Sequence, residues 1–145
     1  MQISLENIEP TDEQTEVLYL QLKKRMHAIS HKKIPLWDEH INFVENHPYR
    51  AWFLLKANRN IIGNAYIQFD NSIGLNCDPN VTAQQFLLVL KKIQLTVPPL
   101  EGIPSIRNDR YHVNISSSDK SLQAKFCDLK FEEIQRTYLL PNTLG

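Results

Sequence analysis

Residues 79–86 join the end of an expected strand to the start of an expected helix, an arrangement that can bind an anion. Pro79 ends the strand because proline cannot donate to a ladder, and Thr82 begins the helix. The first amides of a helix lack intrahelical partners, and the helix dipole favours negative charge there. We therefore expect a phosphate group to bind here. The candidate binding residues are Val81, Thr82, Ala83, Gln84 and Gln85.

The same stretch has a second interpretation as an ordinary helix start. Thr82 is followed three residues later by Gln85, which is a capping-box pattern. In such a box each side-chain oxygen accepts a hydrogen bond from the backbone amide of the other residue, so both amides are used. A closed box would leave only the amides of Ala83, Gln84 and Val81 for a phosphate. The sequence leaves both interpretations open.

Two side chains have the chemistry for proton transfer. Histidine titrates near neutral pH, and His40 lies on an expected helix, where packing is its simpler role. Tyr66 lies on the polar side of an expected strand together with Asn64 and Gln68. That side either lines a substrate cleft or forms a polar rim beneath a helix. We take His40 and Tyr66 as the candidate catalytic residues.

Alternation and helical spacing predict the elements that position these groups. Strands are expected over residues 2–6, 49–57, 61–69, 72 to Pro79, 111–115 and 131–140, and helices over 11–26, 35–45, 82–94 and 120–129. Residues 49–57 are apolar on both faces, which predicts a central strand with helices above and below. The order β-α-α-β-β-β-α-β-α-β predicts the α/β class.

The second helix is expected to begin with Pro35 at its first position, where proline is favoured. Its inward residues are expected to be Leu36, Trp37, Ile41 and Val44, the most apolar set at helical spacing.

Composition limits the function classes. The chain has 145 residues, the length of one domain, so we expect a single domain over residues 1–145. It has 16 basic and 16 acidic residues, so the chain as a whole lacks the excess positive charge expected of a protein that binds nucleic acid or an anionic membrane. Neither a signal peptide nor a membrane span is expected. Cys77 and Cys127 lack metal spacing and are expected to be buried free thiols in the cytoplasm.

The element order, combined with residues 119–131, resembles the GNAT acyl-CoA N-acyltransferase family. Asp119 stands where that family has an Asn, Phe126 where it often has a Tyr, and Lys130-Phe131 where it has Gly-Phe. The stretch IIGNAYIQFDNSIGL resembles the family's third and fourth strands. Residues 35–55, with His40 before an aromatic-rich strand, resemble the amino-sugar acetyltransferase branch. The resemblance implies an α/β fold with a mixed twisted sheet of about six strands and helices on both faces.

The resemblance also implies a reaction, in which a small primary amine, such as an amino sugar, attacks the thioester of acetyl-CoA directly. It assigns a backbone donor for the thioester oxygen to residues Leu75, Asn76 and Cys77, and a coenzyme contact to Asp119. It implies no metal and no covalent enzyme intermediate, so Cys77 is not a nucleophile. A homodimer is left open.

The sequence departs from the family in two ways. The loop before the helix at Thr82 has no glycine, and Phe126 cannot protonate the leaving thiolate. The alternative function is therefore a non-catalytic relative that binds a ligand or a protein partner without turnover.

Overall fold

The computed structural model describes residues 2–28 and 33–145, and this part of the chain forms five strands and four helices. The strands are β1 (Ile3–Asn7), β2 (Ala51–Ala57), β3 (Asn60–Ile67), β4 (Ser72–Cys77) and β5 (His112–Val113). The helices are α1 (Asp12–Ala28), α2 (Trp37–Glu45), α3 (Ala83–Thr96) and α4 (Lys120–Asp128). Most of the connection expected over residues 27–33 lies outside the described residues.

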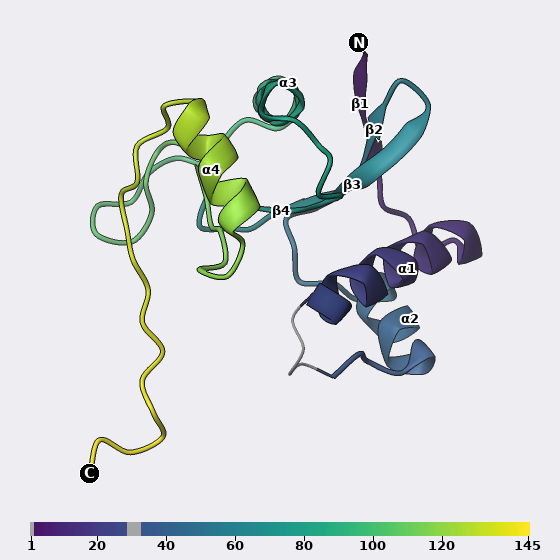
Figure 1. The fold of residues 1–145 in the computed structure, drawn as a ribbon, viewed down its shortest axis with the longest axis horizontal. Helices are drawn as coiled ribbons and strands as arrows, with labels where there is room; N and C mark the ends of the chain where they lie inside the picture. The colour runs from purple at the N-terminus through teal and green to yellow at the C-terminus, as the bar shows by residue number, and fades with distance from the viewer. Residues whose placement is uncertain (1, 29–32) are drawn as a thin grey trace.

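The strands form one mixed sheet in the order β1-β2-β3-β4-β5. The pairs β1–β2, β2–β3 and β3–β4 are antiparallel, whereas β4 and β5 are parallel. Helices α1 and α2 cover one face of the sheet, α3 covers the other, and α4 lies beside α3 (Figure 1). The expected α/β layering with helices on both faces is confirmed. None of the helices in the described ranges is long and apolar enough to cross a membrane.

Strand β2 lies between the two helical layers, as its two apolar faces predict. On one face Trp52 and Leu54 pack with Leu18 of α1 and Val44 of α2. On the opposite face Phe53 and Leu55 pack against α3, in a cluster that also contains buried residues of β1, β3 and β4. Burial on both faces makes β2 the strand that joins the two cores.

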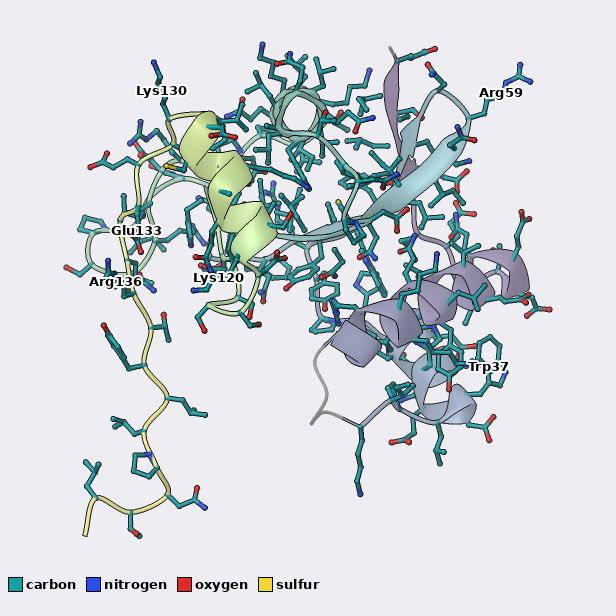
Figure 2. The ribbon with its side chains drawn as sticks, viewed as in Figure 1. Trp37, Arg59, Lys120, Lys130, Glu133 and Arg136 are labelled. Atoms are coloured by element: carbon teal, nitrogen blue, oxygen red, sulfur yellow. The ribbon has the colours of Figure 1, made fainter. Side chains whose placement is uncertain are left out.

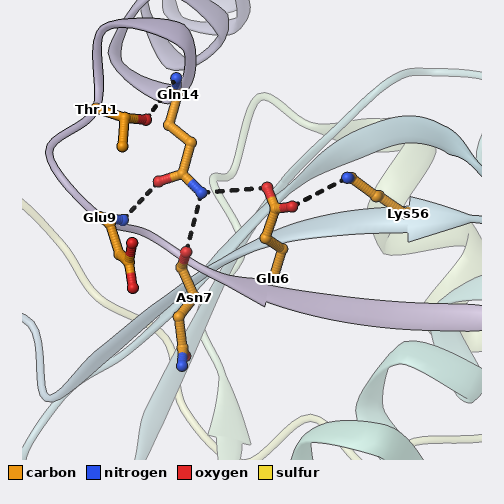
Figure 3. A network of polar contacts seen from close by, with 6 residues as sticks. All are labelled: Glu6, Asn7, Glu9, Thr11, Gln14 and Lys56. Carbon is orange, nitrogen blue, oxygen red and sulfur yellow. Dashed lines mark hydrogen bonds and ion pairs between the residues drawn. The ribbon is translucent and has the colours of Figure 1, made fainter.

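A polar network fixes the start of α1 to β1 (Figure 3). The Gln14 amide donates to Thr11 Oγ1 at 3.2 Å, which is half of a capping box. The Gln14 side chain instead donates to the Glu6 carboxylate at 3.1 Å and to the Asn7 carbonyl at 3.0 Å. Lys56 Nζ lies 3.1 Å from the same carboxylate, and this hydrogen bond lowers the pKa of Glu6.

The expected start of α2 was wrong, and so was part of its expected inward face. The helix begins at Trp37 with Leu36 as N-cap, so Pro35 precedes it. Leu36 is 71% exposed and Trp37 40% exposed, whereas His40 is buried together with Val44. The histidine can face inward because its Nε2 is 2.9 Å from the carbonyl oxygen of Thr15 in α1. A satisfied polar group therefore takes the place expected for an apolar one.

The sixth strand, expected over residues 131–140, is absent from the structure, and the sheet has five strands. Lys130 has φ 60°, and the chain beyond it is an exposed, irregular tail that runs away from the body (Figure 1). An ion pair of this tail is internal, joining Arg136 Nε and Glu133 at 3.3 Å (Figure 2). The preceding strand is also shorter than expected, because only His112–Val113 pairs. Strand propensity alone does not produce a ladder, because the segment must also lie against a partner strand.

Candidate functional site

The sheet opens between β4 and β5. These parallel strands pair over two positions only, Ser72 with His112 and Ile73 with Val113. The last hydrogen bond between the two segments runs from the Asn114 amide to the Ile73 carbonyl at 3.3 Å. Beyond Ile73, β4 pairs with no neighbour on this side among the described residues. The carboxyl half of β4 therefore presents backbone groups to an opening in the sheet.

The β3–β4 register decides which amides point into the opening. Asp78 N–H donates to Ile62, and Asn76 lies opposite Asn64. In an antiparallel ladder the hydrogen-bonded positions alternate, so Leu75 and Cys77 turn their amides away from β3. Among the described residues neither amide has a partner. Leu75 and Cys77, but not Asn76, are thus available to an incoming oxygen atom.

The expected capping box at the start of α3 is closed. The Thr82 amide donates to Gln85 Oε1 at 2.9 Å, and the Gln85 amide donates to Thr82 Oγ1 at 3.1 Å. The Val81 amide donates to the Asp78 carbonyl at 3.1 Å, so it is not available as expected. In the part of the chain that the structure describes, the amides of Ala83 and Gln84 keep no partner.

One cation lies beside this helix start. Lys125 of α4 donates from Nζ to the Pro79 carbonyl at 2.8 Å. Asp119, expected to contact the coenzyme, accepts a hydrogen bond from the Leu122 amide at 3.0 Å and caps α4. The arrangement therefore offers two amides and one ammonium group to an anion.

Apolar side chains fill the opening between β4, α3 and α4. Val81, Phe86 and Leu122 form a buried cluster, with partly buried residues around it. Those surrounding residues are Ile62, Leu75, Cys77, Ile115 and Phe126. This cluster packs against β4 and therefore narrows the approach to the amides of Leu75 and Cys77. Burial also raises the pKa of Cys77 to about 12, so its thiol stays protonated. Cys127, expected to be buried, is exposed.

The two candidate catalytic residues meet at a cavity of about 140 Å³ on the other face of the sheet. Helices α1 and α2 and strands β2, β3 and β4 contribute its walls. The lining residues are Leu18, Gln21, Leu22, Arg25, His40, Phe43, Tyr49, Trp52, Asn64, Tyr66 and Asn76. Sequence reasoning placed His40 and Tyr66 in separate elements and missed Gln21 and Arg25, whose positions on a polar helix carry no distinctive signal.

His40 has a fixed orientation. A carbonyl oxygen can only accept, so Nε2 of His40 carries the hydrogen that is donated to Thr15. In the neutral ring Nδ1 is then the proton acceptor. The ring packs against Tyr19, with centroids 4.9 Å apart, and against Trp37, with centroids 5.9 Å apart. His40 is thus held in the tautomer in which Nδ1 can accept a proton.

The Tyr66 ring is held by a stack and by a glycine. It stacks on Tyr49 with centroids 4.3 Å apart and an interplanar angle of 14°. A Cβ at Gly74 would lie 2.0 Å from the Tyr66 ring, so the ring lies directly against the backbone of β4. Burial, and secondarily the neighbouring Tyr66, raise the pKa of Tyr49. Glycine at position 74 is therefore required for this placement.

An amide network forms part of the cavity wall. Trp52 Nε1 donates to Asn64 Oδ1 at 3.0 Å, and Asn76 Nδ2 donates to the same oxygen at 3.3 Å. Asn64 Nδ2 in turn donates to Gln21 Oε1 at 2.7 Å. The network joins β2, β3 and β4 to α1, so it fixes the shape of the cavity.

Several solved structures have a similar fold. An integron cassette protein from the mobile metagenome of V. cholerae has a TM-score of 0.63 at 11% identity, covering 98% of this chain and 94% of its own. An aminoglycoside acetyltransferase from an uncultured soil metagenomic sample, in complex with sisomicin, has a TM-score of 0.57 at 11% identity, covering 99% and 97%. The chain has the GNAT fold.

A further GNAT-fold structure is a predicted acetyltransferase from Clostridium acetobutylicum with acetyl-CoA, with a TM-score of 0.56 at 12% identity and coverage of 97% and 96%. No protein-family model and no curated protein matches the sequence. Identities this low establish the fold alone. Among the described residues, no cluster of three or more histidine, cysteine or acidic side chains is placed to hold a metal ion.

Proposed function

We propose that the protein is an acetyl-CoA-dependent N-acetyltransferase that acts on a small primary amine, such as an amino sugar. The observation that carries the proposal is the opening of the sheet after Ile73, where β4 presents free amides beside the start of α3. Structural neighbours of the same fold include acetyltransferases, one of them with acetyl-CoA. The cavity with His40 and Tyr66 lies on the face of the sheet that α1 and α2 cover.

In the proposed reaction the amine nitrogen attacks the thioester carbonyl carbon, the carbon–sulfur bond breaks, and coenzyme A leaves as a thiolate. The Leu75 or Cys77 amide stabilises the negative charge on the carbonyl oxygen. His40 takes the amine proton at Nδ1, and the Tyr66 hydroxyl is the second proton-transfer group. Phe126 cannot donate, so the thiolate takes its proton from water.

The coenzyme diphosphate is assigned to the helix start. The amides of Ala83 and Gln84 supply unpaired donors, and Lys125 supplies a positive charge. Thr82 and Gln85 contribute through the capping box, which fixes the direction of the first turn. In this proposal Asp119 positions α4 rather than contacting the coenzyme.

Thermal unfolding with acetyl-CoA tests the proposal. A ligand that binds the folded state stabilises it by mass action, by about 2.7 kcal/mol at a concentration 100 times Kd. We expect the unfolding midpoint to rise with acetyl-CoA in a saturable manner. No rise at millimolar acetyl-CoA would remove the transferase proposal and leave the fold.

The alternative is a GNAT-fold protein that binds without turnover. The closed capping box and the apolar cluster of Phe86, Leu122 and Phe126 favour it, because both restrict access to the anion site and to β4. A coupled assay for free coenzyme A thiol, run with a panel of amines, separates the two functions. Saturable binding of acetyl-CoA without thiol release with any amine supports the alternative.

Replacing Thr82 with glycine is expected to cost roughly 0.3 kcal/mol of stability, because glycine is a tolerable N-cap. The change removes the hydroxyl oxygen that accepts from the Gln85 amide and leaves the Ala83 and Gln84 amides in place, so coenzyme A affinity is expected to stay equal or to rise. Calorimetric titration measures the affinity. Thr11→Gly is the matched control, since it removes the corresponding cap of α1 without altering the α3 amides. Weaker coenzyme binding in Thr82→Gly alone would contradict the amide assignment.

We also propose a homodimer formed through the tail. Its large apolar side chains face water in one chain, and Leu139 is 99% exposed. The exposed tail residues are Phe131, Ile134, Tyr138, Leu139, Leu140 and Leu144. In the ranges that the structure describes, no strand pairs with the outer edge of β5. In the dimer, the tail of each copy would pair with the outer edge of β5 in the other copy. The apolar side chains of the tail would then lie in the interface instead of facing water.

Sedimentation velocity tests the dimer. The full chain is expected to sediment as a dimer at micromolar concentration, and Leu139→Glu is expected to weaken the association by placing a charge in the interface. Leu95→Glu is the matched control, because Leu95 is also highly exposed but lies on α3. A monomeric full chain, or equal effects of the two substitutions, would contradict the tail interface.

A further inference from the structure

The cavity between α1, α2 and the sheet has a distinctive charge. Among the described residues that line it, Arg25 carries a permanent charge and none is an aspartate or glutamate. Sites that bind cationic groups present opposite charge to them. A cavity without a carboxylate, and with an arginine at its wall, repels a polycationic amine and attracts an anion.

The hydrogen-bond network decides which amide atoms remain available. The indole N–H of Trp52 can only donate, so Oδ1 of Asn64 must face it. Nδ2 of Asn64 is then the donor to Gln21 Oε1. This leaves the Gln21 amino group, Nε2, without a partner in the part of the chain that the structure describes. By the same reasoning Asn76 uses Nδ2 and keeps Oδ1 as an acceptor.

Gln21 and Arg25 lie one helical turn apart on α1, so their side chains share a face. Among the described residues no carboxylate pairs with Arg25. The two side chains therefore offer adjacent donor groups, one of them charged, and neither the Gln21 amino group nor the Arg25 guanidinium has an acceptor among the described residues. Such a pair matches the oxygen atoms of a carboxylate or phosphate.

We propose that the acceptor is an amine that also carries an anionic group, a carboxylate or a phosphate. Arg25 and Gln21 bind the anionic group, and Asn76 Oδ1 accepts a hydrogen bond from the amine. The fate of the amine rests on the acetyltransferase function proposed above, whereas the binding of the anionic group does not. Arg25 is the residue that sets specificity.

Matched ligand pairs test this inference on the full chain. Glucosamine and glucosamine 6-phosphate differ by one phosphate, and alaninamide and alanine by one carboxylate. Kanamycin serves as the polycationic probe. Calorimetric titration with each compound, without and with saturating acetyl-CoA, gives the affinities. We expect at least one anionic member to bind about tenfold more tightly than its partner, as one charged hydrogen bond provides.

Variants locate the effect. Arg25→Gln is expected to reduce that preference to about threefold or less, and Arg25→Lys to retain part of it, because it keeps the charge but not the planar fork. Lys24→Gln removes one positive charge, as Arg25→Gln does, but Lys24 does not line the cavity. This variant is therefore expected to retain the preference for the anionic ligand. Unfolding midpoints confirm that each variant is folded.

The outcomes separate the two proposals. A preference for the phosphate or the carboxylate member identifies the anionic group and supports the inference. Equal affinities within both pairs, tighter binding of kanamycin, or an unchanged preference in Arg25→Gln would overturn it. If the preference holds while acetyl-CoA neither binds nor reacts, the anion site stands and the transferase proposal fails.

Discussion

Replacing Gly63 with alanine is expected to lower the free energy of unfolding by about 3 kcal/mol or more, among the larger effects of single substitutions. A Cβ at this position would lie 2.4 Å from the Asn76 carbonyl oxygen and 2.7 Å from Cys77 Cα. Both atoms belong to the β4 backbone, and Gly63 has φ +158°. The strand pair can therefore accommodate a methyl group only by separating. Denaturant titration measures the loss.

Gly74 provides the comparison. A Cβ there meets the Tyr66 ring rather than backbone, so Gly74→Ala can be relieved by removing the ring. The double variant Tyr66→Ala/Gly74→Ala is expected to lose less unfolding free energy than the two single variants lose together. No such rescue exists for Gly63→Ala. A Gly63→Ala protein within about 0.5 kcal/mol of the original would contradict the close approach of β3 and β4.

Replacing His40 with glutamine is expected to lower kcat by about 100-fold or more, as loss of a general base does. Glutamine can still donate a hydrogen bond to the Thr15 carbonyl, so the helix contact is kept. It cannot accept and hold the amine proton. The KM for acetyl-CoA is expected to stay unchanged, because the coenzyme is assigned to the opposite side of β4. Steady-state kinetics with the anionic amine measure both constants.

His47→Gln is the matched control for this variant. His47 contacts Tyr49 and Trp52 but does not line the cavity, and burial lowers its pKa. We expect its kcat to remain within about threefold of the original. Equal losses in the two variants, or an unfolding midpoint that falls only in His40→Gln, would assign His40 a packing role.

Local pattern was sufficient for the elements whose partners are set by burial. The two apolar faces of residues 51–57 predicted a strand between helical layers, and the pairing of Thr82 with Gln85 predicted the capping box. Both features depend on residues close in sequence. The strand expected over residues 131–140 was wrong, because a strand pattern alone does not bring a segment against a partner strand, and this segment is exposed along its length.

The site depended on long-range contacts that no local pattern encodes. Packing was the simpler role expected for His40, but the sequence did not indicate its partner, and a hydrogen bond to the Thr15 carbonyl makes its burial acceptable. Asn64 and Tyr66 alternate along β3, which did indicate a polar face. The contact of that face with Gln21 crosses from β3 to α1 and appears only in the folded chain.

The hydrogen bond between Trp52 and Asn64 has a spectroscopic consequence. The sequence contains two tryptophans, and Trp37 is 40% exposed, whereas Trp52 is 8% exposed and lines the cavity. Indole emission depends on the polarity around the ring and on the bond at its nitrogen. In a Trp37→Phe background, intrinsic fluorescence would therefore report occupancy of the cavity directly, without a label, on the timescale of a stopped-flow mixing experiment.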